Sequence, residues 1–552
     1  MDRISQLPTE ILHQILSLLP TKTAARTAVL SKQWLKACYT NSNLCFDESD
    51  FGEEQQNNGR FVDFHGEFSR LIDYTLERYH RENLPISAFK LHISFSDQTD
   101  CEGLVDKWLE IIAERRASQV ALLVKSEYGV YSKKYSLLAD SIFAIESLQE
   151  LEINCCRILK QKALLSEDKI KCSNLKNLTL CYVTVSESAL DSLISCCSQI
   201  QTISFQHCMG FNCIRISKNL PNLLSLHILK CPIMEVHIGD APKLLSFEYV
   251  NKGDSERLYR HNLDICLRTL EIGTCQNLRS VEFVKAEIDD VVLFELIPKL
   301  HFIKELILHY CKYLKKIKIS SSTLEVCSIE SCACSVQATF DVPKLLFLVV
   351  KPMQDFGERI RLPCLSFESA SSQCRISIKY GGLPSDPEHI IDLRRSLVEL
   401  NDKVIDLTLD SIGKGLRATS GVDHFPSTEV ENLILTYGDW SITSYSSYLN
   451  DVFWICQPKN LTVHCGNKFK KFVCQQLLKK CWWRPFKYSW KEYFINAQID
   501  CMKRGGDDWM TLDWKMLAAN PRIIEEIRII RFKHTQRKEI KKESYILRCI
   551  PK

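Results

Sequence analysis

The chain has 552 residues, a formal net charge of +4, 45% hydrophobic residues and 25% charged residues. At about 100–200 residues per domain this is too long for one compact core, and the composition excludes a wholly disordered chain. The small net charge argues against electrostatic binding of the whole chain to nucleic acid or to a membrane. We therefore expect several domains or one long repeat array.

The first twenty residues, the lengths of the apolar runs and the cysteines indicate the cellular compartment of the protein. Residues 1–20 lack the basic start and clean apolar run of a secretory signal, and no run of 18 apolar residues could span a bilayer. We expect a soluble protein of the nucleus or cytoplasm. In that reducing environment the 26 cysteines should be mostly buried thiols.

Residues 1–45 have the pattern of a compact helical unit. Leu7-Pro8-Thr9-Glu10 suits a first helical turn, because proline is tolerated there and the helix dipole favours an acidic residue. Pro20 should stop this helix, a second should cover Thr23 to Val29, and Ser31 is a suitable N-cap for a third. The first helix carries apolar residues at helical spacing, namely Ile11, Leu12, Ile15, Leu16 and Leu19.

Residues 46–85 are expected to connect this unit to the rest of the chain. Residues 47–60 are polar and acidic, which indicates a linker or an exposed loop. Residues 61–80 repeat aromatic and aliphatic side chains at helical spacing, which predicts an amphipathic helix.

Residues 86–480 repeat a short frame: apolar, two others, apolar, one other, apolar, two others, then a small residue. The clear copies are Leu148-Leu151-Ile153-Cys156, Ile200-Ile203-Phe205-Cys208, Leu223-Leu226-Ile228-Cys231, Leu267-Leu270-Ile272-Cys275, Ile303-Leu306-Leu308-Cys311 and Leu324-Cys327-Ile329-Cys332. Weaker copies that lack the last cysteine start at Leu175 and Leu244. With these two included, the frames from Leu148 to Leu267 start about 21–27 residues apart, which is the leucine-rich-repeat period. We predict an irregular solenoid, with an inserted helix around Asp290 to Leu300.

Each frame predicts a short strand that points alternate apolar side chains into a shared core. A single repeat cannot bury its own apolar face, so the repeats must stack. The last position should turn the chain away from the strand, with a small side chain beneath the turn. The cysteines at this position should therefore be buried, reduced and aligned along one edge of the solenoid: Cys156, Cys208, Cys231, Cys275, Cys311 and Cys332.

Residues 481–552 lack the frame. An aromatic patch around Trp482, Trp483 and Trp490 is followed by an expected helix over Asp513 to Leu517 and a strand over Ile523 to Phe532. We interpret this region as a C-terminal cap that ends in a basic tail. The tail could be a nuclear-import signal, a contact for an acidic partner or simply a solvated chain end.

The N-terminal unit resembles the F-box family. Three blocks match in order over residues 2–39: Leu7-Pro8-Thr9-Glu10-Ile11-Leu12, Ile15-Leu16-Ser17-Leu18-Leu19-Pro20 and Val29-Leu30-Ser31-Lys32-Gln33-Trp34. With the repeats behind it, the chain is similar to plant-type F-box/leucine-rich-repeat proteins. The resemblance implies an α/β protein with an N-terminal three-helix F-box unit, an irregular leucine-rich-repeat solenoid and a C-terminal cap. Many relatives also carry a C-terminal FBD module, which residues 481–552 do not match.

The resemblance also implies a docking surface for a Skp1-type adaptor and, through it, a cullin. The positions that match the family's motif are Leu7, Pro8, Ile11, Leu12, Ile15, Leu16, Leu30, Ser31 and Trp34. About forty residues cannot easily bury so many large apolar groups, which fits a surface made for a partner. The leading hypothesis is a non-catalytic substrate-recognition subunit of an SCF-type E3 ubiquitin ligase, whose repeats hold an unknown protein substrate.

Two alternatives remain open at this stage. The repeats could form a small-ligand receptor. The candidate basic residues are Lys312, Lys315, Lys316 and Lys318, and Arg359 with Arg361, although a solvated outer face explains them too. The protein could also be an interaction scaffold that never joins a ligase.

We expect no enzymatic activity and no cofactor. The sequence has no phosphate-binding glycine loop and no nucleophile elbow, and no local pattern singles out a catalytic cysteine among the 26. No two cysteines have C-x-x-C spacing. The nearest metal-ligand candidates do not supply four ligands locally, namely His207-Cys208, His464 with Cys474, and Cys332-x-Cys334. A metal site is therefore not expected either.

Overall fold

The computed structural model divides the chain into two compact units. One consists of Met1–Leu314 and Ile319–Leu324, and the other of Lys315–Lys318 and Glu325–Lys552. The described residues are 7–19, 21–52, 64–95, 102–126, 135–138, 142–154, 156–159, 170–216, 220–251, 266–273, 275–332, 337–352, 362–383, 387–412, 428–437, 445–478, 498–512, 515, 517, 520 and 522–533.

The first unit begins with helices. They are α1 (Thr9–Ser17), α2 (Thr21–Thr27), α3 (Lys32–Thr40), α4 (Ser49–Gly52), α5 (Phe64–Arg81) and α6 (Glu102–Glu114). Ser31 caps α3 as expected, since its hydroxyl accepts a hydrogen bond of 3.2 Å from the Trp34 N–H. The expectation of a linker from residue 47 is wrong at its start, where α4 directly follows a strand. The amphipathic helix predicted over residues 61–80 is confirmed in its described part.

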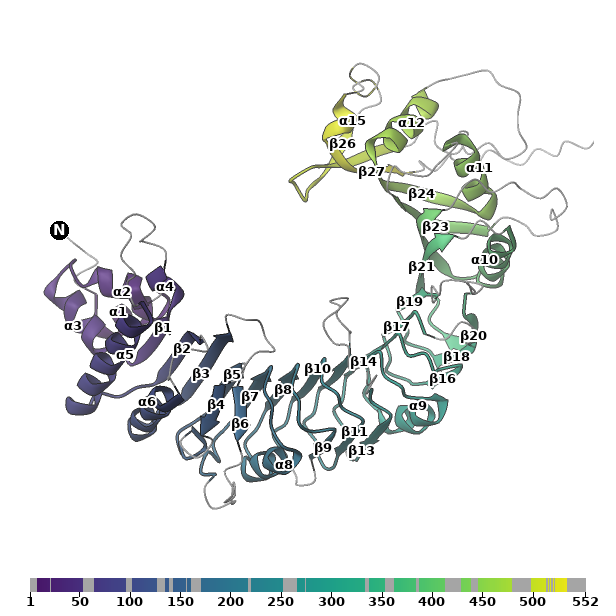
Figure 1. Cartoon of the computed structure of the whole chain (residues 1–552). Helices are drawn as coiled ribbons and strands as arrows, with labels where there is room; N and C mark the ends of the chain where they lie inside the picture. Colours follow the sequence, from purple (N-terminus) through teal and green to yellow (C-terminus); the bar gives the residue numbers. More distant parts are fainter. Residues whose placement is uncertain are drawn as a thin grey trace, which may run out of the picture. The chain divides into compact units, whose positions relative to one another are not determined.

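A main sheet of parallel strands follows, and Figure 1 shows these strands side by side in chain order. They are β1 (Asn43–Asp47), β2 (Ala88–Phe95), β3 (Gln119–Ser126), β5 (Glu150–Asn154), β7 (Asn177–Cys181), β8 (Thr202–Gln206), β10 (Ser225–Leu229), β12 (Ser246–Val250), β14 (Ser280–Val284) and β15 (Glu305–His309). Each strand pairs in parallel with the next one named.

The apolar positions of the frame form continuous rows across this sheet. The register aligns Leu178 with Ile203 and Leu226, and Leu180 with Phe205 and Ile228, and these side chains are fully buried. Burying one such side chain stabilises the fold by about 1.5–3 kcal/mol. Each repeat thus covers the apolar face of its neighbour, as the stacking argument predicts.

Shorter strands of this unit form two further sheets, separate from the main sheet. One small sheet consists of β9 (Cys213–Ile216), β11 (Glu235–Ile238) and β13 (Thr269–Ile272), and another of β4 (Tyr135–Leu138) and β6 (Cys156–Leu159). The frame that starts at Leu267 forms a strand as predicted, but this strand, β13, belongs to the small sheet and not to the main sheet. Strands of both sheets alternate apolar and polar residues, and periodicity alone cannot separate them.

A left-handed residue marks the turn at the end of the frame. Residues with φ of 50–57° directly precede Cys208, Cys231, Cys311 and Cys332. The N–H of one of them, His207, donates a hydrogen bond of 2.9 Å to the Leu229 carbonyl of the next repeat. The predicted sharp turn is confirmed, and its backbone hydrogen bond connects neighbouring repeats.

The cysteines beneath these turns behave largely as predicted. Cys208, Cys231, Cys311 and Cys332 are buried and reduced. The thiol of Cys208 donates to the Leu180 carbonyl at 3.2 Å, which ties it to the preceding repeat. Cys275 is buried too, but it follows β13 of the small sheet, so its predicted place in the same row is wrong. The side chain of Cys156 lies outside the described residues.

Helices also lie between described strands of the repeats in this unit. α8 (Glu187–Cys196) starts after Ser186, whose hydroxyl accepts from the Ala189 N–H. α9 (Asp290–Leu296) starts after Asp289, whose carboxylate accepts from two backbone N–H groups, and it continues into the 3-10 helix η3 (Ile297–Lys299). The inserted helix predicted around Asp290 to Leu300 is confirmed.

The second unit continues the repeat pattern with longer elements. Its parallel strands are β17 (Val326–Glu330), β19 (Phe347–Lys351), β21 (Arg375–Leu383), β22 (Val404–Ile412), β23 (Thr428–Tyr437) and β24 (Cys456–Cys465), and each pairs with the next one named. Between the later strands lie α10 (Pro387–Glu399) and α11 (Tyr445–Ile455), and α12 (Asn467–Leu478) follows β24. A separate small sheet contains β16 (Lys316–Ser320), β18 (Gln337–Val342) and β20 (Cys364–Ala370).

The last described strands run against the parallel direction. β27 (Ile527–Lys533) pairs antiparallel with β24 and with β25 (Gln498–Lys503), which in turn pairs antiparallel with β26 (Trp509–Leu512). The strand predicted over Ile523 to Phe532 begins later, because Ile523–Glu526 form the short helix α15. The aromatic patch around Trp482 and the basic tail beyond Lys533 lie outside the described residues. Among the described helices, none is both long and apolar enough to cross a membrane.

Candidate functional site

The three N-terminal helices share a small apolar core. Leu12 and Leu16 of α1 and Trp34 of α3 are at most 3% exposed, and Ala24 and Ala37 fill the space between them. Two polar bridges also join α1 to α3. The five core side chains hold the helices together, and because they are buried they offer no surface to a partner.

The bridges fix the relative position of α1 and α3. The side-chain amide of Gln33 donates a hydrogen bond of 2.8 Å to the Leu7 carbonyl. The ring of His13 lies 3.0 Å from the hydroxyl of Thr40. Because both bridges connect positions far apart in the unit's sequence, they give the helical surface a defined shape.

Large apolar side chains remain on the outside of the same unit. The exposed fractions are 38% for Ile11, 84% for Leu18, 87% for Val29, 57% for Leu30 and 39% for Leu35. Solitary exposed leucines are common on proteins, but five such residues within one small unit are not. We call these five residues the apolar surface of the helical unit.

The structure separates the residues that the family resemblance singles out. It exposes Pro8, Ile11 and Leu30, half-buries Leu7, Ile15 and Ser31, and buries Leu12, Leu16 and Trp34. Contact with an adaptor stays a prediction for the first six, whereas the last three can act only by holding the helices in place. Sequence reasoning missed Leu18, Val29 and Leu35, because apolar spacing does not show which side of a short helix faces the core.

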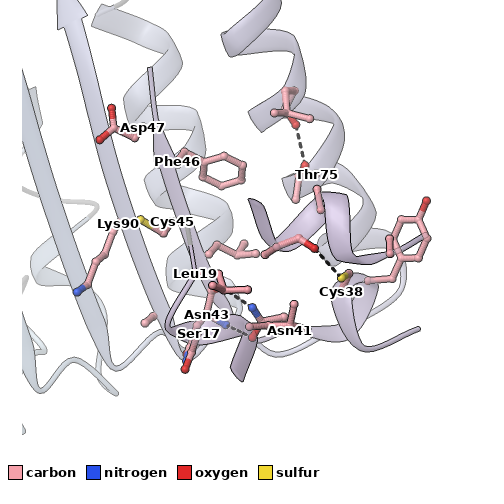
Figure 2. A pocket seen from close by; sticks show the side chains of 18 of the residues that line it. Ser17, Leu19, Cys38, Asn41, Asn43, Cys45, Phe46, Asp47, Thr75 and Lys90 are labelled. Atoms are coloured by element: carbon pink, nitrogen blue, oxygen red, sulfur yellow. Dashed lines mark hydrogen bonds between the residues drawn. The ribbon is translucent and has the colours of Figure 1, made fainter. Parts of the chain in front are cut away.

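A cleft of about 1080 Å³ lies between the helical unit and the start of the main sheet. Figure 2 shows Cys38 of α3, Phe46 of β1 and Thr75 of α5 around it. Leu18 and Leu35 of the apolar surface also line this cleft. The apolar surface therefore extends from the outside of the helices into a concave region beside the first strand.

The helical unit is fastened to α5 without losing that surface. The hydroxyl of Tyr79 donates a hydrogen bond of 2.6 Å to the Asn41 carbonyl, and the guanidinium of Arg78 lies 4.5 Å from the ring centre of Tyr39. Burial raises the pKa of Tyr79 to about 12, so its hydroxyl keeps its proton and remains a donor. The attachment uses residues other than the five that form the apolar surface.

The main sheet of the first unit has one face that the core does not cover. Polar and charged side chains occupy this open face at alternate strand positions. The ring of His227 lies 2.8 Å from the Glu248 carboxylate of the next strand, and the rings of Tyr182 and His207 stack at 4.3 Å at the strand ends. Such a face can form hydrogen bonds and aromatic contacts with a protein segment.

The sheet of the second unit carries a chain of polar contacts across four strands. Arg375 of β21 forms an ion pair of 2.5 Å with Asp406 of β22, whose carboxylate also accepts from the Asn432 amide of β23 at 2.6 Å. The Asn460 amide of β24 then donates to the Asn432 side-chain oxygen at 3.0 Å. These contacts leave an ordered row of polar groups on that sheet face.

The lysine cluster considered for a small ligand does not lie on the main sheet. Lys316 and Lys318 are exposed residues of β16, which belongs to the small sheet with β18 and β20. Lys312 interacts with Glu287 at 3.9 Å. Lys316 and Lys318 therefore do not supply the receptor hypothesis with a basic pocket on the main sheet, and Arg359 and Arg361 lie outside the described residues.

Several buried thiols are poor nucleophiles for a physical reason. Burial raises the pKa of Cys456 and of Cys474 to about 12 and that of Cys275 to about 11. These thiols therefore stay protonated near neutral pH. A catalytic cysteine needs the opposite, a thiolate in an electropositive and partly open setting.

Comparison with known families decides what the helical unit is. A model described as "F-box domain" matches residues 4–46, and the model "FBD-associated F-box protein At5g56370, LRR repeats" matches residues 105–267. The chain carries an F-box domain followed by leucine-rich repeats. The resemblance and the expected fold class are thereby confirmed, and neither matched model describes an enzymatic domain.

Curated proteins of Arabidopsis thaliana are similar to parts of the chain. "F-box/LRR-repeat protein At1g48400" is 40% identical over 22% of this chain and 24% of its own length, and "F-box protein At5g03100" is 30% identical over 42% and 64%. "FBD-associated F-box protein At4g10400" is 27% identical over 47% and 58%. The chain thus matches less than two thirds of the length of each of these relatives.

Proposed function

We propose that the protein is a substrate adaptor of an SCF-type ubiquitin ligase. Its F-box would bind a Skp1-type adaptor and through it a cullin, and its repeats would hold a protein substrate. The observation that carries this proposal is the set of five large apolar side chains that the F-box leaves exposed beside a complete internal core. A unit that has satisfied its own core and still exposes such residues is suited to a partner.

The turn between α2 and α3 is the part of this surface on which the proposal depends most. Val29 and Leu30 lie there, and they are two of the most exposed large apolar residues of the F-box. Covering them removes apolar area from water without requiring the helices to rearrange. We therefore expect them to contribute more to adaptor binding than the buried Leu12, Leu16 and Trp34 of the predicted contact set.

The repeats would supply the substrate contact through the open face of the main sheet. His227, Glu248 and the Tyr182–His207 ring pair there belong to a rigid strand framework. Such a framework presents side chains at fixed spacing, which limits the conformational cost of binding a partner. The ligase would then act by proximity, since a held substrate experiences a high effective concentration of the ubiquitin-charged enzyme.

The test measures binding of the purified full chain to a purified Skp1-type adaptor by gel filtration and calorimetry. We expect a one-to-one complex, and we expect the double variant Val29→Asp/Leu30→Asp to weaken it by at least about 100-fold, because two charged groups would be buried against apolar partner surface. The matched control is Val291→Asp/Phe294→Asp, which changes two exposed apolar residues of α9 in the repeats, 60% and 63% exposed.

The control should bind the adaptor as the unmodified chain does. If the unmodified chain forms no complex, the ligase proposal fails and an interaction scaffold becomes the better reading. If both double variants weaken binding equally, the contact does not reside in the F-box. Circular dichroism of each variant checks that the helices remain folded.

A further inference from the structure

Three chemically different metal-ligand side chains meet on the small sheet of β9, β11 and β13. The register pairs Cys213 of β9 with Glu235 of β11, and it aligns Arg215, His237 and Glu271 two residues further along. Alternate strand residues project from the same face, and the positions between them point into the buried core. All five side chains therefore start from the outer face of this sheet.

The three side chains are close enough to share one ion, and the distance between two of them matches that around a tetrahedral ion. The Cys213 sulfur, a Glu235 carboxylate oxygen and a His237 ring nitrogen lie within 4.8 Å of one another. His237 Nε2 and Glu235 Oε2 are 3.3 Å apart, which is longer than the ~2.7–2.9 Å of a charge-assisted hydrogen bond. Two ligands bound at about 2.0–2.2 Å to one tetrahedral Zn²⁺ lie roughly 3.3–3.5 Å apart.

A fourth residue orients the imidazole. His237 Nδ1 lies 2.8 Å from Glu271 Oε2, which is a good hydrogen-bond distance and fixes the ring. With Nδ1 occupied, Nε2 faces Glu235 and Cys213. A carboxylate that holds the second ring nitrogen is the usual support of a metal-bound histidine.

The electrostatic surroundings also suit a cation. The nearby helix α8 contributes Glu187 and Asp191, and the guanidinium of Arg215, the closest positive group, is paired with Glu187. Cys213 is 5% exposed, whereas the side chains of His237 and Glu235 are 30% and 47% exposed, so the group is accessible to solvent at His237 and Glu235. A water can complete the coordination as a fourth ligand.

We propose that Cys213, Glu235 and His237 bind one divalent ion of the Zn²⁺ class, with Glu271 positioning His237. The mixed thiolate, imidazole and carboxylate set favours Zn²⁺ or Co²⁺ over the hard cations Mg²⁺ and Ca²⁺. The ion ties β9 to β11, two strands of successive repeats. The sequence alone predicts no metal site because its ligands come from different strands, and a search at local spacing cannot find them.

The test titrates the full reduced chain, freed of metal, with Co²⁺ as a spectroscopic stand-in for Zn²⁺. We expect one equivalent to bind with the visible bands of a four-coordinate ion and a near-ultraviolet sulfur-to-cobalt charge-transfer band, and Zn²⁺ should displace it. Cys213→Ser should remove the charge-transfer band, and His237→Gln should abolish the four-coordinate spectrum. Glu271→Gln should keep the spectrum but weaken binding about 10–100-fold, as loss of an orienting partner does.

The matched control is His227→Gln. His227 also lies on a strand, 2.8 Å from a glutamate of the neighbouring strand, but it is not part of the Cys213 cluster. This variant should bind Co²⁺ as the unmodified chain does. The proposal fails if the unmodified chain binds no Co²⁺ with a charge-transfer band, or if the band persists in Cys213→Ser. Since His237 is partly exposed, His237→Gln provides a test even if the cysteine variant folds poorly.

Discussion

The F-box and the frame positions of the repeat strands differ in how much of their large apolar side chains they bury. In the repeats, Phe205 and Leu226 are fully buried, and each is aligned with a buried apolar residue of the next strand. In the F-box, Leu18 and Val29 are 84% and 87% exposed. An extended repeat array can bury its rows of apolar strand residues against the next repeat, whereas a unit of three short helices is too small to bury all of its large apolar side chains. The apolar residues left over are available to another protein.

The difference is sharpest within a single helix. Leu12 lies in α1 and Leu18 directly follows its last residue. Leu12 is buried in the F-box core, whereas Leu18 is exposed. We expect Leu12→Ala to lower the local stability of α1–α3 by about 2–5 kcal/mol, because it opens a cavity. Leu18→Ala should change that stability by less than about 0.5 kcal/mol. Amide hydrogen exchange of α1–α3 in the full chain measures both.

The matched pair also separates folding from binding. Leu18→Ala should weaken adaptor binding while the exchange rates of α1–α3 in the free chain stay unchanged. If Leu12→Ala and Leu18→Ala destabilise the helices to the same extent, then the division into core and apolar surface is wrong.

A smaller effect concerns the turns of the repeats. Lys285 is exposed and holds φ of 56°, a left-handed conformation that costs a side-chain-bearing residue about 1–2 kcal/mol. Glycine avoids this cost but loses about 0.5–1 kcal/mol of chain entropy on folding. Lys285→Gly should therefore stabilise the first unit by about 0.5–1 kcal/mol, measured by denaturant unfolding.

The opposite substitution checks the sign. Lys285→Val should destabilise the same turn, because a β-branched residue tolerates positive φ poorly. Equal stabilities for the glycine and valine variants would mean that the left-handed turn is not what shapes the repeat.

Much of this architecture is readable from the sequence because local chemistry and global position agree. The cap at Ser31 and the frame ending at Cys208 both lie where the sequence predicts them. The sequence does not reveal that the frame at Leu267 forms a strand of the small sheet, because β13 and the main-sheet strand β14 carry the same alternation. The long strands and intervening helices of the second unit, such as β22 and α10, also exceed what a fixed short frame can predict.

The candidate sites are less predictable than the fold. Short helices do not reveal from spacing alone that Leu12 faces inward and Val29 outward, because tertiary packing decides which apolar residues remain exposed. The group of Cys213, Glu235 and His237 depends on the register between strands, which no local motif encodes. Sites that form across repeats therefore require the three-dimensional arrangement.

The most direct test of the central claim is hydrogen exchange of the full chain with and without a Skp1-type adaptor. The account predicts that the adaptor slows exchange in α1, α2, α3 and the Val29–Leu30 turn, while strands β7 to β15 exchange as before. Protection confined to the repeats, or no protection of the F-box at saturating adaptor, would contradict it.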